Sequence, residues 1–364
     1  MKPDIYLSFF LLVSFGLITL ILVTQLTKIA SGQITTTIPT ISTRNHFNLS
    51  SGELNSIQTP TSYIASANIP GFKVGTTCPP ELAIYIHGFW VGSNSLEKPE
   101  EIFDRAKKSI TANNFTIPLV GFSWDSDTKI LPPDGTGWTT AKVIAKENGP
   151  KLAQFISDYK NKCQATEIRL IAHSMGARVV LSTLESLYKN QAWNNKNFKI
   201  ASVHLMGAAV DDEEVAKSPS YIIEDPSMLL DIKEWYDVYG IKSADGHAIE
   251  KEVVKFYNLF DPEDNALQQS TLYPLFEQDN ALGLRGSQVD IQPPSNYLDI
   301  NVQDEIPVIT DANGNGKCDL TDVFGCTIEN VGDNHFGYVG FENKNDKLID
   351  DGAMNIVVNN WKNP

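Results

Sequence analysis

The chain has 364 residues, of which 42% are apolar and 20% are charged, so it is long enough to bury a sizeable hydrophobic core. Its formal net charge at pH 7 is −15. A surface of that sign repels phosphate groups, which argues against nucleic-acid binding and against docking on anionic lipid.

The first 32 residues predict a transmembrane or signal segment. Residues 5–27 contain no charged side chain, and a helix of that length can cross about 30 Å of hydrocarbon. Two interpretations stay open: an uncleaved membrane anchor, which the length favours, and a signal peptide cleaved near Ala30-Ser31-Gly32. Both place the rest of the chain outside the cell, either secreted or anchored to the membrane. A buried core helix is the third possibility.

Residues 33–60 are rich in Thr, Ser and Asn and have little apolar periodicity, which is typical of an extended linker. In residues 61–364 short apolar runs alternate with helical stretches, the pattern of a mostly parallel sheet with helices on both faces. The sequence therefore predicts one α/β domain over residues 61–364. Strands are expected at 82–86, 117–122, 167–172, 198–206, 252–259 and 296–302, and helices at 99–112, 139–159, 177–188 and 350–361.

The segment Ala172-His173-Ser174-Met175-Gly176 lies between a predicted buried strand and a predicted helix. A serine on such a sharp turn stands above the sheet edge, and small residues on either side let the strand and the helix pack closely. The helix N-terminus adds partial positive charge where an oxyanion would form. Ser174 is therefore the candidate nucleophile, and a plain helix-capping serine is the alternative. His173 is expected to point into the layers beneath.

A second motif, His87-Gly88-Phe89-Trp90, follows the strand predicted at 82–86. An acyl-transfer enzyme of this kind needs an oxyanion donor there. The backbone N–H groups of Phe89 and Met175 are the two candidates, and Gly88 would permit a close backbone approach. His87 is expected to orient the loop.

A serine hydroxyl needs a base to take its proton, and the base needs an acid to orient it. Where the nucleophile sits on a strand-to-helix turn, the chain order is serine, acid, histidine. Only His335 follows the acidic turn after the strand predicted at 252–259, so the order selects it. In that turn we favour Asp264, because the strand must turn before the acid can reach back. Asp261 and Glu263 stay open.

These segments together resemble the α/β-hydrolase superfamily, over about residues 75–345. The motifs that carry the resemblance are the strand and HGF loop at 82–89, the strand end at 121–124, the serine turn at 172–176, the segment 203–211 and Asp333-Asn334-His335. The chain is most similar to a lipase- and esterase-like branch whose strand after the HG loop ends in Ser-Trp. The resemblance implies an α/β-hydrolase fold with Ser174, Asp264 and His335 as the catalytic triad.

The expected activity is hydrolysis of a carboxylic ester through an acyl-enzyme on Ser174. The substrate would be a small-molecule or lipid ester, and the chemistry requires no cofactor. Two alternatives stay open: an amidase or peptidase that uses the same groups, and a catalytically inactive hydrolase fold that serves as a surface-binding module.

One segment, within an expected insertion at residues 304–333, lies outside the hydrolase pattern. It has oxygen ligands at the spacing of an EF-hand-type calcium loop, with Gly at its sixth position, and it resembles the calcium loops of dockerin modules. The candidate ligands are Asp311, Asn313, Asn315, Lys317 through its backbone carbonyl, Asp319 and Asp322. A structural Ca²⁺ bound there would order the segment before His335, and a plain Gly/Asn turn is the alternative.

The four cysteines predict two disulfides. In the hydrolase sheet Cys78 and Cys163 would precede neighbouring parallel strands, at the end of the sheet opposite the catalytic residues, where Cα atoms can approach within bonding range. Cys318 and Cys326 would then pair beside the candidate calcium loop. Disulfides persist in the same oxidising compartments that the predicted export segment implies.

Overall fold

The structure is a computed structural model. It describes residues 38–363, except for residues 74, 90, 92–97, 129–135, 218–244, 265, 269–280, 288–291, 307–333 and 343–346. The segment expected to be a membrane anchor or signal, residues 1–32, lies outside this range. Among the described residues, no helix is both long and apolar enough to span a bilayer.

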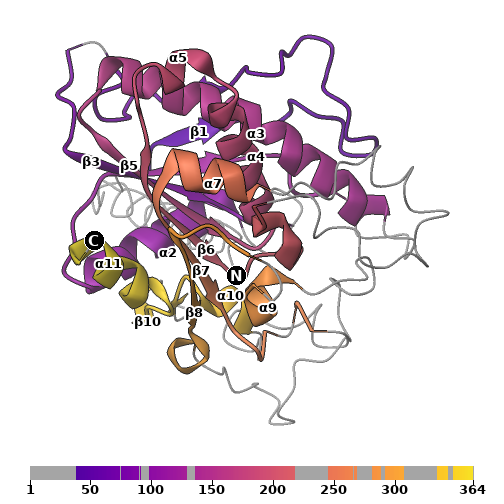
Figure 1. Ribbon diagram of the computed structural model, residues 1–364, viewed down its shortest axis with the longest axis vertical. Coiled ribbons are helices and arrows are strands. Elements are labelled where there is room, and N and C mark those ends of the chain that lie inside the picture. The colour runs from indigo at the N-terminus through magenta and orange to yellow at the C-terminus, as the bar shows by residue number, and fades with distance from the viewer. Residues whose placement is uncertain are drawn as a thin grey trace, which may run out of the picture. The chain divides into compact units, whose positions relative to one another are not determined.

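The described part of the chain forms an eight-stranded sheet in the order β2-β1-β4-β3-β5-β6-β7-β8 (Figure 1). All neighbouring strands are parallel except β1 and β2. The bounds are β1 Thr40–Ser42, β2 Ile64–Ala65, β3 Glu81–Ile86, β4 Leu119–Ser123, β5 Glu167–His173, β6 Ile200–Met206, β7 Val253–Phe260 and β8 Tyr297–Asn301. The predicted, mostly parallel sheet is confirmed.

Helices cover both faces of the sheet. The helical bounds are α2 Pro99–Ala112, α3 Thr136–Lys162, α4 Gly176–Tyr188, α5 Gln191–Asn194, η1 Asp212–Val215, α7 Gly246–Glu252, α9 Leu282–Arg285, η4 Gln303–Glu305, α10 Asn334–Gly337 and α11 Met354–Lys362. A small hairpin of β9 Phe341–Glu342 and β10 Leu348–Asp350 precedes α11. Each strand and helix predicted from the sequence has a counterpart within a few residues.

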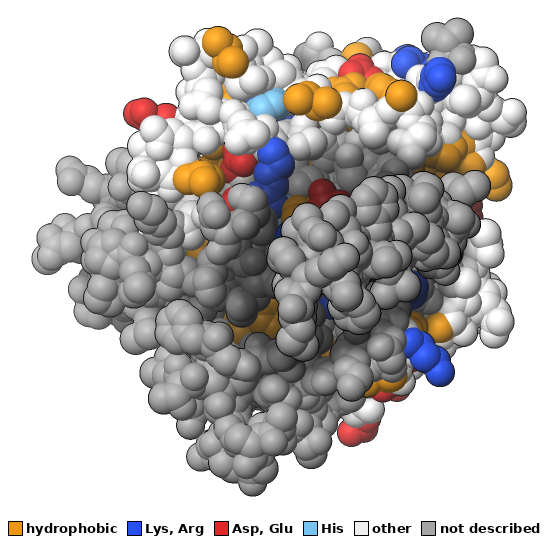
Figure 2. Space-filling view, turned by 180° about the vertical axis from the view of Figure 1, so that it is seen from behind, with side chains coloured by type: hydrophobic (Ala, Val, Ile, Leu, Met, Phe, Trp, Pro, Cys, Tyr) orange, Lys and Arg blue, Asp and Glu red, His pale blue; other side chains and the backbone are white. Residues whose placement is uncertain are grey.

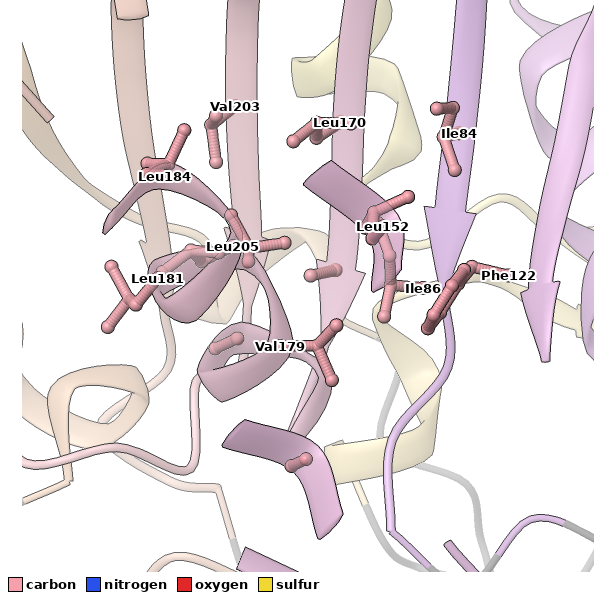
Figure 3. Packing of buried hydrophobic residues seen from close by; sticks show 14 of the residues in the cluster. Ile84, Ile86, Phe122, Leu152, Leu170, Val179, Leu181, Leu184, Val203 and Leu205 are labelled. Carbon is pink, nitrogen blue, oxygen red and sulfur yellow. The ribbon is translucent and has the colours of Figure 1, made fainter. Parts of the chain in front are cut away.

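The hydrophobic core consists of two layers, one on each face of the sheet. Because successive side chains of a strand point to opposite faces, Ile84 of β3 lies in the layer with α3, α4 and α7, while Tyr85 lies in the layer with α2 and α11. Figure 3 shows the first layer, in which leucines of α4 lie over Val203 and Leu205 of β6. Burying one such aliphatic side chain contributes about 1.5–3 kcal/mol. On the surface seen in Figure 2, by contrast, apolar side chains lie in small separate groups.

The expected linker is wrong for its described part, residues 38–60. Strand β1 lies inside the sheet and pairs in parallel with β4, and Ile41 and Phe47 are buried in the core. The carboxylate of Asp125, just after β4, accepts the backbone N–H groups of Asn45 and Phe47 at 2.9 and 3.1 Å. The segment has no visible periodicity because it contributes only a three-residue strand and isolated apolar contacts.

The predicted disulfide between Cys78 and Cys163 is confirmed, with its Cα atoms 5.5 Å apart. The two cysteines precede β3 and β5, which are neighbours with Glu81 opposite Glu167. The bond therefore lies at the amino ends of these strands. Cys318 and Cys326 lie outside the described residues.

Candidate active site

Ser174 lies on the turn between β5 and α4. Its φ of +54° is in the left-handed region, which residues other than glycine rarely adopt. Such a conformation costs on the order of 1–3 kcal/mol and persists only where its surroundings fix it. Here the Ser174 N–H donates to the Met206 carbonyl at 2.9 Å, and the Ser174 carbonyl accepts from Ala177 and Ala209 at 3.0 and 3.2 Å. The serine is thereby fixed at the carboxyl edge of the sheet.

Two glycines allow the end of β3 to pass directly against this turn. A Cβ on Gly176 would lie 2.7 Å from the carbonyl oxygen of Ile86 and 2.8 Å from that of His87. A Cβ on Gly88 would lie 2.7 Å from the Cβ of Ser174. Since neither a backbone oxygen nor a Cβ, which is fixed by its own backbone, can move away without a shift of the main chain, glycine is required at both positions. The HG loop consequently lies against the candidate nucleophile.

The structure brings Asp264 and His335 together. Nδ1 of His335, in α10, lies 2.8 Å from Oδ2 of Asp264, and the two residues are 5% and 0% exposed. The other oxygen of Asp264 accepts the backbone N–H groups of Ala266 and Leu267 at 3.0 and 3.1 Å. These two bonds orient the carboxylate so that Oδ2 faces the imidazole.

The other two acids of the turn have different places. The carboxylate of Asp261 is buried and accepts the backbone N–H of Glu263 at 2.8 Å, so it shapes the start of the turn. Glu263 itself is exposed. Of the three candidates from the sequence, Asp264 is the one whose side chain contacts His335.

His173, the residue before Ser174, fixes the backbone that carries His335. Its Nε2 lies 2.7 Å from the carbonyl oxygen of His335, and the two imidazole rings are 4.7 Å apart. Because a carbonyl only accepts, Nε2 of His173 carries the proton and donates it. Burial, followed by the proximity of His335, lowers the pKa of His173 well below its usual value, so the ring is neutral. The expected inward orientation of the His173 side chain is confirmed. Its contact with the backbone of His335 was not predicted.

Two further residues support the segment that follows His335. Ser109 of α2 donates its hydroxyl to the carbonyl of Val339 at 2.7 Å. The ring of Tyr338 packs beside His335, and burial together with the charge of Asp264 raises the pKa of Tyr338 well above its usual value. Tyr338 is therefore un-ionised next to the carboxylate.

The surroundings of the two candidate oxyanion donors, Phe89 and Met175, are partly described. Met175 is the N-cap residue of α4, where the first N–H groups of a helix have no partner within the helix. Phe89 follows Gly88, which lies against Ser174, and the Phe89 ring packs edge-on against Trp138 at 5.2 Å. Trp90 is outside the described residues.

The candidate calcium ligands, Asp311 to Asp322, also lie outside the described residues. Where the chain is described, no group of three or more His, Cys, Asp or Glu side chains is placed to bind a metal ion.

Sequence analysis missed Arg44, whose guanidinium contacts Asp127 at 2.7 Å beyond the end of β4. One signal was present: Asp125 and Asp127 follow a buried strand directly, and buried carboxylates need donors or a cation. The strand pattern indicated where these acids lie but not which cation they meet.

Comparison with known proteins places this chain in a family. Residues 74–284, more than half of the chain, match the model of an alpha/beta hydrolase of unknown function (DUF900). An uncharacterized protein of Nostoc sp. is 37% identical over 82 residues, which are 22% of this chain. The match spans only 20% of that relative's length.

Several solved lipases and esterases have weak structural likeness to the chain. Lipase B of Aspergillus fumigatus is 11% identical with a TM-score of 0.33, covering 66% of this chain and 47% of the lipase. A hormone-sensitive lipase from a metagenome library is 12% identical with a TM-score of 0.31, covering 63% and 70%. The esterase Pf2001 of Pyrococcus furiosus is 10% identical with a TM-score of 0.29, covering 61% and 73%. Likeness of this degree carries no inference about activity, whereas the match over residues 74–284 shows that the chain belongs to the DUF900 family of α/β hydrolases.

Proposed function

We propose that this chain is a serine hydrolase that cleaves carboxylic esters through an acyl-enzyme on Ser174. One observation carries the proposal: a buried His335–Asp264 pair, 2.8 Å apart, lies beside the strand end that presents Ser174 in a left-handed turn. A nucleophile, a base and an acid that orients the base are the minimum set for covalent acyl transfer.

The roles of the three groups follow from these contacts. Asp264 accepts the Nδ1–H of His335, which leaves Nε2 as the nitrogen that takes the proton of Ser174 Oγ. Oγ then forms a bond to the ester carbonyl carbon, and His335 returns the proton to the departing alcohol. A water molecule, activated by the same imidazole, hydrolyses the acyl-enzyme and restores the serine.

The tetrahedral intermediate needs donors for its oxyanion. The backbone N–H groups of Phe89 and Met175 are the proposed donors. The support for them is that Met175 directly follows Ser174 and that Gly88, the residue before Phe89, lies against Ser174. Removal of one such donor costs about 2.7–4 kcal/mol of transition-state stabilisation in a serine hydrolase. No cofactor enters these steps.

The setting of the enzyme is also a proposal. The Cys78–Cys163 disulfide and the apolar segment at residues 5–27 favour an extracellular enzyme, secreted or anchored to the membrane. The net charge of −15 favours a neutral small-molecule or lipid ester over a polyanionic substrate such as nucleic acid.

Labelling by a fluorophosphonate probe, which reacts with activated serines, tests the proposal. The wild-type protein should be labelled, Ser174→Ala should not, and His335→Ala should be labelled at least about a hundredfold more slowly. Ser186→Ala is the matched control, because that hydroxyl lies on α4, the helix that follows Ser174, and donates to the Ser182 carbonyl within the helix. Absence of labelling in folded wild-type protein would support the inactive binding module instead.

Ester and amide substrates separate the remaining alternative. We expect hydrolysis of p-nitrophenyl esters of graded acyl length and much slower cleavage of the matched anilides. Anilides cleaved as fast as the esters would indicate an amidase or peptidase.

A further inference from the structure

Arg44 lies before residues 74–284, the part of the chain that the family match covers, and it connects that earlier segment to the residues after β4. Its Nη1 contacts Asp127 Oδ1 at 2.7 Å, and its Nε donates to Ser123 Oγ at 3.0 Å. The Arg44 side chain is mostly buried, and its backbone neighbours are bound by Asp125. Burial lowers the pKa of Arg44, while the negative charges of Asp127 and Asp125 raise it and offset part of this effect. The guanidinium stays charged.

The remaining nitrogen of Arg44 reaches the loop that carries Phe89. Nη2 donates to the carbonyl of Val91 at 2.5 Å and lies 3.4 Å from Nε2 of His87. His87 and Val91 are the first and last residues of loop 87–91, so one guanidinium contacts both ends of this loop. Ser126 also fixes Val91: its hydroxyl accepts the backbone N–H of Val91 at 3.2 Å and donates to the Val91 carbonyl at 2.9 Å.

The contact with His87 has a consequence for the next peptide. Nε2 of His87 is approached by two donors, the backbone N–H of Trp124 at 3.2 Å and Arg44 Nη2, so it must be the accepting nitrogen. Nδ1 therefore carries the hydrogen, and it donates to the carbonyl of Gly88 at 2.9 Å. Burial, followed by the charge of Arg44, lowers the pKa of His87 well below its usual value, so the ring stays neutral.

That hydrogen bond sets the direction of the Phe89 N–H. In a planar trans peptide, the carbonyl of one residue and the N–H of the next point in opposite directions. Because the Gly88 carbonyl is bound by His87, the Phe89 N–H points away from the His87 ring. Gly88 itself lies against Ser174.

We propose that Arg44 is a positioning residue for the oxyanion donor Phe89, acting on both ends of loop 87–91. The inference rests on the proposed function. It gives the segment before residues 74–284 a role in turnover, because β1 and its pairing with β4 place Arg44.

The test is Arg44→Lys, which keeps the positive charge but loses the planar fork that reaches Asp127, Ser123 and Val91 together. We expect kcat for a p-nitrophenyl ester to fall about 10–100-fold, since one displaced oxyanion donor can cost 10²–10³. KM should change less than about threefold, because the donor acts on the transition state and not on the bound ester. The inhibition constant of a trifluoromethyl ketone, which forms a tetrahedral adduct on the serine, should rise by the same factor as kcat falls.

The matched control is Arg169→Lys. Arg169 is also buried, contacts Glu81 and Glu167 at 2.7 and 3.2 Å, and lies toward the amino end of β5, away from Ser174. The Arg169→Lys variant should have a lower melting temperature. Its kcat per active site, with active sites counted by fluorophosphonate labelling, and its inhibition constant should not change. A purely structural role for Arg44 would give that same result.

The outcomes separate the two proposals. Wild-type protein that is neither labelled nor active overturns the proposed function and this inference with it. Labelled wild-type protein, with Arg44→Lys unchanged in kcat per active site, overturns the inference alone. If Arg44→Lys does not fold, Ser126→Ala is the substitute test, because it removes the other side-chain hydrogen bonds to Val91. The proposal predicts that this variant has a lower kcat at constant KM. Unchanged kcat in Ser126→Ala would then overturn the inference.

Discussion

Replacing one oxygen of Asp264 with an amide nitrogen should stop turnover while leaving the turn intact. In Asp264→Asn the remaining oxygen can still accept the N–H groups of Ala266 and Leu267, which bind Oδ1 at 3.0 and 3.1 Å. The new NH₂ group would then face Nδ1–H of His335, so two donors would meet. The imidazole avoids this by moving its proton to Nε2, the nitrogen that must take the proton of Ser174.

The size of the effect follows from that tautomer. A triad with its histidine in the wrong tautomer loses about 10⁴ in kcat, which at 1.36 kcal/mol per tenfold is about 5 kcal/mol of transition-state stabilisation. Asp261→Asn provides the matched control, since its oxygen can still accept the N–H of Glu263. We expect kcat of that variant within about threefold of the wild-type value.

Steady-state ester hydrolysis, corrected by active-site titration, measures both variants, and a thermal melt checks that they fold. KM should change little in either. The reasoning is refuted if Asp264→Asn retains more than a tenth of wild-type kcat. If Asp261→Asn is the more damaging change, Asp261 is the acid.

Three further predictions concern other parts of the molecule. Replacing Cys78 and Cys163 by alanine should lower the free energy of unfolding by about 2–4 kcal/mol. Because the bond precedes β3 and β5, kcat should not change, and a loss of activity at constant melting temperature would contradict this. Gly176→Ala should lower kcat about tenfold or more, since its Cβ would lie 2.7 Å from a backbone oxygen; wild-type kcat in this variant would contradict the packing argument. We propose that residues 311–322 bind Ca²⁺, so millimolar calcium added after chelation should raise the melting temperature at constant kcat. Asp311→Ala should abolish that rise. If calcium leaves the melting temperature of the wild-type protein unchanged, the segment is a plain Gly/Asn turn and the calcium proposal is wrong.

The parts of the site that depend on local pattern could be predicted from the sequence. The turn of Ser174 follows from a buried strand, small residues at positions 172 and 176 on either side of the serine, and a helix directly after them. The choice of Asp264 over Asp261 required one further argument: the chain must turn after the strand before a carboxylate can contact the histidine. In the structure the carboxylate of Asp264 does face His335.

Contacts between single polar residues distant in sequence could not be predicted, because they leave no period to detect. Arg44 meets Asp127 across 83 positions, and His173 meets the backbone of His335 across 162. The linker prediction for residues 33–60 is wrong over the described residues 38–60 for the same reason. The Thr- and Ser-rich composition of this segment says nothing of the hydrogen bonds that join it to the end of β4.

The contacts of His335 bear on whether calcium should affect catalysis. The candidate calcium loop ends at Asp322, thirteen residues before His335, which suggests that ordering the loop would also place the base. In the structure, however, His335 contacts two parts of the core: its backbone carbonyl binds His173 of β5, and its ring binds Asp264 after β7. Ser109 of α2 binds the carbonyl of Val339, four residues further on. A base held by these contacts, in a segment that is also bound to α2, does not depend on the candidate calcium loop for its position. We therefore expect calcium to act on the stability of the chain and the loop 87–91 to govern turnover.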